Sequence, residues 1–396
     1  MVNRHVNGPL KQVAGNAYAR QALLPEGFRD QLAPKAEQEA ALVRGLVDTF
    51  LSHGYDRVAP PLVEYEDSLL VGAGKTRAKQ MFRLMDPDTQ RMMAVRADMT
   101  IQMARLASTR LADAPRPLRL AYTGNVLRTK GSQLRPTRQF VQAGVELVGS
   151  PSLEAELEVI ALAVEALAAV GIAELSLDLT VAPLVAMMCD QHKLTGDVRE
   201  RVMAALEAKD IGGLAALDAD ARQDFEKLLQ AAGPADQANK LLSELALKGA
   251  AGKLIARLGR LTDMILDRLP NLPVTIDPCE SHGFEYKSGI GFALFAKGGE
   301  GELARGGRYL VSHPDGQAEE ATGFSVYLDT LMKALPAPEK ADHVFLPFGT
   351  KSSDGNKLRA EGWRTVQGLE GTVDPLSDAK RLGCSHILLD EQVRPV

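Results

Sequence analysis

The sequence predicts an α+β fold built on an antiparallel sheet. Strand-like segments fill much of the first half of the chain, a helical stretch almost without aromatic residues follows over about 190–270, and glycine-rich, strand-like segments then return. Strands that are grouped in this way, rather than alternating regularly with helices, indicate the α+β class. The chain has 396 residues, enough for two or three domains, because single cores rarely grow beyond about 250–300 residues.

The composition narrows the class of protein. The chain is 45% hydrophobic and 24% charged with a net charge of −5, which argues against a nucleic-acid partner bound through a basic surface. Its cysteines, Cys189, Cys279 and Cys384, are far apart and fit a reducing compartment. No segment resembles a secretory signal or reaches the ~20 apolar residues of a membrane span. We therefore expect a cytoplasmic protein with no membrane partner.

The first elements follow from periodicity. Residues 1–22 are polar and predict a loose arm. Residues 36–55 predict an amphipathic helix with Leu42, Leu46 and Phe50 on its buried face. Residues 56–70 predict an extended segment, interrupted by two prolines and suited to a sheet edge or an interface.

The next elements form the expected sheet and its first covering helices. A helix over 101–112 lies between the second and third of four short strands, and a long helix over 152–171 begins at Ser152 as its N-cap. The predicted strands are 80–86, 91–100, 117–128, 138–149 and, after the long helix, 174–179.

The second half completes the domain plan. Strands are expected over 283–296 and 302–309. Residues 323–335 predict a helix on the core, because apolar residues recur there at helical spacing. The expected domains are an N-terminal arm (1–22), a main domain (23–190 with 271–335), a helical insertion (191–270) and a short C-terminal α/β subdomain (341–396).

The sequence does not match three common functional motifs: the phosphate loop, a metal-binding histidine pair and the GxSxG elbow. The segment "VGAGKT" (71–76) suggests a phosphate loop, but that motif needs a glycine five positions before Gly74, where Leu69 stands. A glycine turn followed by a charged loop is the better interpretation. The seven histidines include no HxxH or HExxH pair, so no metal site is expected, and no GxSxG elbow is present. No cofactor is expected either.

Five segments occur in a specific order: "RADMT" (96–100), "GNVLR" (124–128), "RQFVQAGVE" (138–146), "GFEY" (283–286) and "ARGGRY" (304–309). Together they resemble the catalytic domain of class II histidyl-tRNA synthetases over residues 23–335. The resemblance is closer still to the paralogous regulatory subunits of ATP phosphoribosyltransferase. It implies a class II aminoacyl-tRNA synthetase-like domain in which helices flank an antiparallel sheet.

The resemblance implies a histidine pocket. Asp98 and Thr100, with help from Gln142, match the residues that hold the α-amino group of histidine. Glu146 and Tyr286 match those that hold the two imidazole nitrogens, and this chemistry is sound because a carboxylate accepts from a ring N–H and a phenol can donate or accept. Arg128, the arginine of "GNVLR", also matches the ligand-binding set.

The positions that match the ATP-binding residues of synthetases depart from the synthetase pattern. Lys130 and Gln139 stand where synthetases have glutamates, and His282 stands where they have an arginine that grips the carboxylate; a neutral imidazole lacks the permanent charge and planar fork of a guanidinium. Tyr327 stands where they have a glycine, and Thr330 where they have an ATP-binding arginine. Losing one such electrostatic contact typically costs about 10²–10³ in rate. No residue is therefore expected to be catalytic.

The resemblance implies a non-catalytic regulatory subunit of ATP phosphoribosyltransferase. It implies a short catalytic subunit as partner, L-histidine as effector, and a homodimer within a hetero-octamer. The short tail and acidic charge make tRNA binding unexpected. Two alternatives remain open: a divergent histidyl-tRNA synthetase or other amino-acid adenylating ligase, and a scaffold whose pocket is empty.

Overall fold

The computed structural model describes residues 23–70, 78–131, 136–280 and 287–396 of the chain. Its contacts divide the chain into two compact units. One unit contains residues 23–30 and Glu39–Pro336, and the other contains Gln31–Gln38 and Ala337–Val396.

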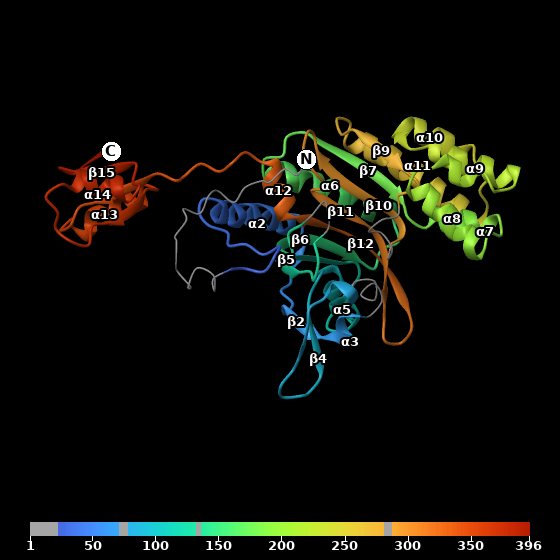
Figure 1. Cartoon of the computed structure of the whole chain (residues 1–396), viewed down its shortest axis with the longest axis horizontal. Helices are drawn as coiled ribbons and strands as arrows, with labels where there is room; N and C mark the ends of the chain where they lie inside the picture. The colour runs from blue at the N-terminus through green and yellow to red at the C-terminus, as the bar shows by residue number, and fades with distance from the viewer. Residues whose placement is uncertain (1–22, 71–77, 132–135, 281–286) are drawn as a thin grey trace. The chain divides into compact units, whose positions relative to one another are not determined.

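A nine-stranded sheet forms the centre of the first unit (Figure 1). The neighbour pairs β1–β5 and β7–β9 are parallel. All the other neighbouring strands of this sheet are antiparallel, so the predicted antiparallel α+β architecture is confirmed. In spatial order the strands are β1 (Asp56–Arg57), β5 (Leu118–Leu127), β6 (Gln139–Val148), β12 (Ala318–Tyr327), β11 (Ala304–Ser312), β10 (Lys287–Ala296), β7 (Leu175–Val181), β9 (Val274–Asp277) and β8 (Gly233–Pro234).

Helices α2 (Lys35–Ser52) and α6 (Leu153–Ala169) bury the larger core against one face of this sheet. The predicted face of α2 is confirmed, because Leu42, Leu46 and Phe50 are all buried. The predicted N-cap of α6 is also confirmed, since the Ser152 side chain accepts a hydrogen bond from the Ala155 amide at 3.2 Å. A fully buried Leu or Phe side chain contributes about 1.5–3 kcal/mol relative to an exposed one, so this face carries much of the stability.

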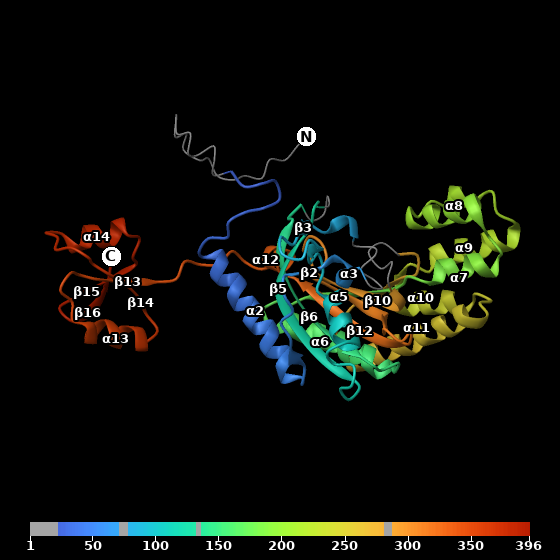
Figure 2. The same ribbon diagram turned by 90° about the horizontal axis from the view of Figure 1, so that it is seen from below.

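Helix α5 (Thr100–Ser108) packs on the opposite face, where Met99, Met103 and Ala107 meet Tyr122 and other sheet residues. Figure 2 shows α2 and α5 on opposite sides of β5. A small sheet adjoins α5, with strand order β2 (Val63–Tyr65), β4 (Met92–Val95) and β3 (Arg83–Met85). The short helices α3 (Glu66–Leu69) and η1 (Ala78–Gln80) lie beside it in the chain.

Between β7 and β9 the chain is almost entirely helical. These helices form one group beside β7 and β9 in Figure 1, and α11 packs along α6. They are α7 (Leu184–Gln191), α8 (Gly196–Glu207), η2 (Ile211–Leu214), α9 (Ala219–Gln230), α10 (Ala235–Ser243) and α11 (Gly249–Arg268).

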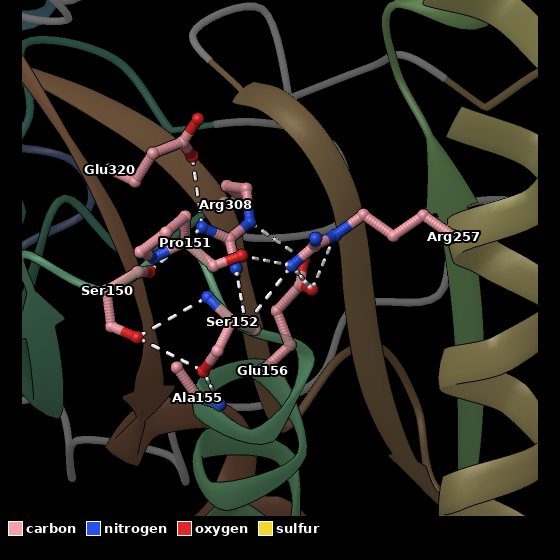
Figure 3. Close-up of polar contacts among 8 residues, drawn as sticks. All are labelled: Ser150, Pro151, Ser152, Ala155, Glu156, Arg257, Arg308 and Glu320. Carbon is pink, nitrogen blue, oxygen red and sulfur yellow. Dashed lines mark hydrogen bonds and ion pairs between the residues drawn. The ribbon is translucent and has the colours of Figure 1, made fainter. Parts of the chain in front are cut away.

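A buried ion cluster fastens α11 and α6 to the sheet (Figure 3). Arg308 on β11 donates to Glu156 on α6 at 3.0 Å and to Glu320 on β12 at 3.0 Å. Arg257 on α11 donates from Nε to the same Glu156 at 2.9 Å. Both arginines also donate to the Ser152 carbonyl. Glu156 is only 3% exposed, so water does not solvate its carboxylate. Two guanidinium groups balance its charge instead.

The second unit contains a four-stranded sheet in the order β14-β13-β15-β16. Strand β13 pairs parallel with β14 and β15, whereas β15 and β16 are antiparallel. Its elements are β13 (His343–Leu346), α13 (Ser352–Ala360), β14 (Arg364–Gln367), α14 (Pro375–Arg381), β15 (His386–Leu389) and β16 (Gln392–Pro395).

One predicted element is wrong in its first half. The helix expected over 323–335 is a strand up to Tyr327, and only α12 (Leu328–Ala334) is helical. Residues 323–327 form backbone pairs with β6 and β11 on both sides, so tertiary pairing overrides the helical spacing of the apolar residues. Helix α5 is also shorter than the predicted 101–112 and ends at Ser108.

Candidate functional site

The candidate site lies on the face of the large sheet that carries α5. Residues directly opposite each other in an antiparallel pair share a face, and alternate residues of one strand return to it. The register of β6, β12 and β11 therefore brings three short sets together on this face: Gln142, Gly144 and Glu146; Tyr327, Ser325 and Gly323; and Arg305, Gly307 and Tyr309.

Two buried tyrosines hold the Glu146 carboxylate on the site face. Tyr309 donates its hydroxyl to Glu146 Oε2 at 2.9 Å, and Tyr122 donates to Oε1 at 3.3 Å. Glu146 is 1% exposed, so these phenols take the place of water around the carboxylate. Burial, followed by the nearby Glu146 and Asp98 carboxylates, raises the pKa of Tyr122 well above its ordinary value. The Tyr122 phenol therefore keeps its proton and stays a donor.

A glycine on the neighbouring strand makes room for this carboxylate. Gly323 stands directly opposite Glu146 in the β6–β12 register. A Cβ atom at this position would lie 1.9 Å from Glu146 Oε2 and 2.4 Å from the Val145 carbonyl oxygen. Any side chain at 323 would therefore displace Glu146. The glycine is a requirement of the site and not only of the sheet.

A line of hydrogen bonds joins Glu146 to the other end of the site. Gln142 donates from Nε2 to Ser325 Oγ at 2.7 Å, and Ser325 Oγ lies 2.9 Å from the Tyr122 hydroxyl. Since Tyr122 uses its single hydroxyl proton towards Glu146, Ser325 is the donor to Tyr122 in this arrangement. The backbone amide of Met99 donates to Gln142 Oε1 at 2.9 Å, which fixes the orientation of the Gln142 amide.

Asp98 and Thr100 lie at the start of α5 and reach the same network. Asp98 Oδ1 accepts from the Thr100 amide at 2.9 Å and from Gln142 Nε2 at 3.3 Å. The Thr100 hydroxyl lies 3.4 Å from that of Tyr122. Asp98 and Thr100 are 5% and 7% exposed, so both are held inside the protein. The structure thus brings together Asp98, Thr100, Gln142 and Glu146 from two separate segments of the sequence.

The opposite end of the site is aromatic. The Arg128 guanidinium carbon lies 5.0 Å from the centre of the Phe140 ring, and Tyr327 packs edge-on against Phe140 with ring centres 6.0 Å apart. Tyr327 is 7% exposed, so its ring fills this part of the sheet face. Thr330 is buried in the first turn of α12, whereas Lys130 and Gln139 are exposed.

Two predicted site residues, Tyr286 and His282, lie outside the described residues. Four residues that sequence reasoning did not single out lie on the site face: Tyr122, Tyr309, Ser325 and Arg305. Strand alternation was the signal that could have found them, because each stands opposite, or two positions from, another residue on the site face. Reading that signal requires the strand register, which the sequence does not give.

This arrangement suits a small ligand with a cationic group at one end and an N–H donor at the other. The Asp98 carboxylate favours an ammonium group, and the Glu146 carboxylate accepts from an N–H. Within the described ranges, no group of three or more His, Cys, Asp or Glu side chains is placed to hold a metal ion. No helix in the described part of the chain is long and apolar enough to cross a bilayer.

Comparisons with known proteins agree on the family. The family model for histidyl-tRNA synthetase matches residues 27–331. An ATP phosphoribosyltransferase regulatory subunit of Rhodospirillum centenum is 46% identical over 95% of this chain and 96% of its own length. That of Rhodospirillum rubrum is 45% identical over 96% and 98%.

Two solved structures share the fold. A protein of Bacillus halodurans, described as an ATP phosphoribosyltransferase regulatory subunit/histidyl-tRNA synthetase, has a TM-score of 0.77 at 25% identity and covers 91% of this chain and 96% of its own. A histidyl-tRNA synthetase of Nostoc has a TM-score of 0.76 at 19% identity, with 93% and 91% covered. The latter match shows that chain length does not separate this protein from a synthetase. The chain belongs to the histidyl-tRNA synthetase-like family, among the ATP phosphoribosyltransferase regulatory subunits.

Proposed function

We propose that this chain is a non-catalytic subunit that binds L-histidine and regulates the short catalytic subunit of ATP phosphoribosyltransferase. In this proposal it activates the catalytic subunit and conveys inhibition by histidine, as a homodimer within a hetero-octamer. Residues 53–65 are the proposed dimer contact. The names of its relatives support the partnership. The observation that carries histidine binding is the buried hydrogen-bonded line from Asp98 to Glu146.

The geometry of this line fits histidine in three respects. The Asp98 end offers a carboxylate and a hydroxyl to an ammonium group. The Glu146 end offers a fixed carboxylate to an imidazole N–H, and Gly323 opposite Glu146 keeps the carboxylate in place. For inhibition, histidine must bind two states of the assembly unequally, and a coupling free energy of about 1–3 kcal/mol is typical of such regulation.

The positions that match the ATP-binding residues of synthetases support the absence of adenylation. Adenylation needs bound ATP and a site that neutralises charge on its α-phosphate. In this chain the Tyr327 ring packs against Phe140 at the position where synthetases have a glycine. Thr330 supplies no cation where they have an arginine. Lys130 and Gln139 stand where they have glutamates. The rival proposal is a divergent synthetase or other adenylating ligase, which the family match over residues 27–331 favours.

Pyrophosphate exchange separates the two proposals. With ATP, Mg²⁺, labelled pyrophosphate and saturating L-histidine, we expect no exchange above the background of a no-protein control. The same preparation, mixed with the short catalytic subunit, should raise its phosphoribosyltransferase rate and make that rate sensitive to histidine. Histidine-dependent exchange would establish the ligase instead. Normal activation with no histidine binding would support the empty-pocket scaffold.

Replacing Glu146 by Gln tests the assigned pocket. The glutamine keeps the size of the side chain but removes the charge that an imidazole N–H requires. Charge-assisted hydrogen bonds contribute about 1.5–3 kcal/mol, so the Kd for histidine, measured by calorimetry, should rise about 10–100-fold. Co-purification with the catalytic subunit should be unchanged, and inhibition should need correspondingly more histidine. Unchanged inhibition in E146Q would mean that histidine acts at another place.

A further inference from the structure

Strand β11 places a cation, Arg305, on the site face. The family resemblance gave this residue no role. Arg305 is paired with Ser325, which is paired in turn with Gly144. Ser325 Oγ contacts both Gln142 and Tyr122, so this row faces the site, and Arg305 shares its face. Adjacent strands lie about 4.8 Å apart, which puts the base of the Arg305 side chain one strand spacing from the centre of the hydrogen-bonded line.

We propose that Arg305 binds the carboxylate of the amino acid held between Asp98 and Glu146, and that it thereby selects an amino acid over its carboxylate-free analogues. This inference rests on the proposed function, since it concerns the same pocket. It assigns to Arg305 the role that the resemblance places at position 282, where this chain has a histidine. A guanidinium carries a permanent charge and a planar fork that matches a carboxylate, and a neutral imidazole has neither.

The Arg305 side chain is partly buried and held in place. It is 20% exposed and forms a two-point ion pair with Glu302, in which Nη2 donates to Oε1 at 2.6 Å. Burial acts to lower the pKa of Arg305, but Glu302, Tyr327 and Glu280 together outweigh it and raise that pKa. The guanidinium therefore stays protonated in a partly desolvated place, with Glu302 fixing the orientation of its Nε and Nη2 groups.

The three ends of an α-amino acid fit three different rows of the sheet face. A row here is a set of residues paired across neighbouring strands. Gln142 and Tyr327 form one row, which lies beside Asp98. Arg305 and Ser325 belong to the next row, and Glu146, Gly323 and Gly307 to the one after it. An ammonium at Asp98, a side-chain N–H at Glu146 and a carboxylate at Arg305 give three separate points of attachment. Three points around one carbon distinguish the L from the D form.

Two nearby arginines are less suited to this role. Arg308 projects to the opposite face of β11, where Glu156 and Glu320 engage it. Arg128 lies over the Phe140 ring at the aromatic end of the site. Arg128 is the rival carrier of the carboxylate, and it can be tested in the same experiment.

Calorimetry with L-histidine and L-histidinol measures the carboxylate contact directly, because histidinol keeps the amine and the imidazole but ends in an alcohol. We expect the wild-type protein to prefer histidine by about 10–100-fold, the range of a charge-assisted contact. In R305M this preference should fall to about threefold or less, with the Kd for histidinol nearly unchanged. Control variant K297M removes an exposed lysine, 78% accessible and paired with Glu174, and should keep the wild-type preference.

The outcomes are distinguishable. If wild-type protein binds histidine and R305M keeps the full preference, the inference is wrong, and loss of the preference in R128M would give the role to Arg128. If wild-type protein binds neither compound, the proposed function itself fails and takes this inference with it. Should R305M not fold, R305K retains the charge without the planar fork and should show a clearly reduced preference; a full preference in R305K overturns the inference.

Discussion

Replacing Glu156 by Ala is expected to lower the free energy of unfolding of the first unit by about 3–5 kcal/mol, the usual cost of removing one partner from a buried ion pair. The reason is the ion cluster of Figure 3: Arg308, itself 5% exposed, and Arg257 would both lose the carboxylate that neutralises them. Urea denaturation followed by far-ultraviolet circular dichroism measures the change.

Two controls make this prediction specific. Glu174→Ala removes an exposed ion pair with Lys297, 63% and 78% accessible, and should cost less than about 1 kcal/mol. The single tryptophan, Trp363, packs in the core of the second unit, so its fluorescence should report an unchanged transition there. If E156A lowers the free energy of unfolding as little as E174A does, the cluster does not stabilise the unit.

Under the proposed function, replacing Gly323 by Ala is expected to abolish histidine binding at concentrations that saturate the wild-type protein. The new Cβ would overlap the Glu146 carboxylate and the Val145 carbonyl, so Glu146 must leave its two tyrosine partners. Overpacking of this kind also destabilises proteins by about 1–3 kcal/mol. Calorimetry gives the affinity, and a denaturation curve gives the stability.

Gly259→Ala is the matched control for this change. Gly259 lies within α11, and a Cβ there meets no atom within 4 Å. Alanine is favoured over glycine inside a helix by about 0.5–1 kcal/mol, so G259A should be at least as stable as wild type and should bind histidine normally. Normal histidine binding by G323A would show that the ligand does not depend on the position of Glu146.

Much of the fold could be predicted from the sequence because local patterns and packing agree there. The buried face of α2 follows from helical spacing, and the Ser152 cap of α6 follows from the preference of such residues for helix starts. The helix predicted over 323–335 was wrong in its first half because the local pattern was ambiguous. Phe324 and Val326 alternate as strand residues do, but helical spacing also fits the segment, and only the partners on β6 and β11 decide between the two.

The sequence by itself determined the family and predicted several residues of the candidate site, because ordered motifs such as those of Asp98, Gln142 and Glu146 depend on identity and order along the chain. Only the tertiary structure decided which side chains surround them. Tyr122, Tyr309, Ser325 and Arg305 reach the site through strand register, and a shift of one residue would turn each of them to the other face. Register is set by pairing between segments that lie far apart in the sequence, which is why the chain's own order does not reveal it.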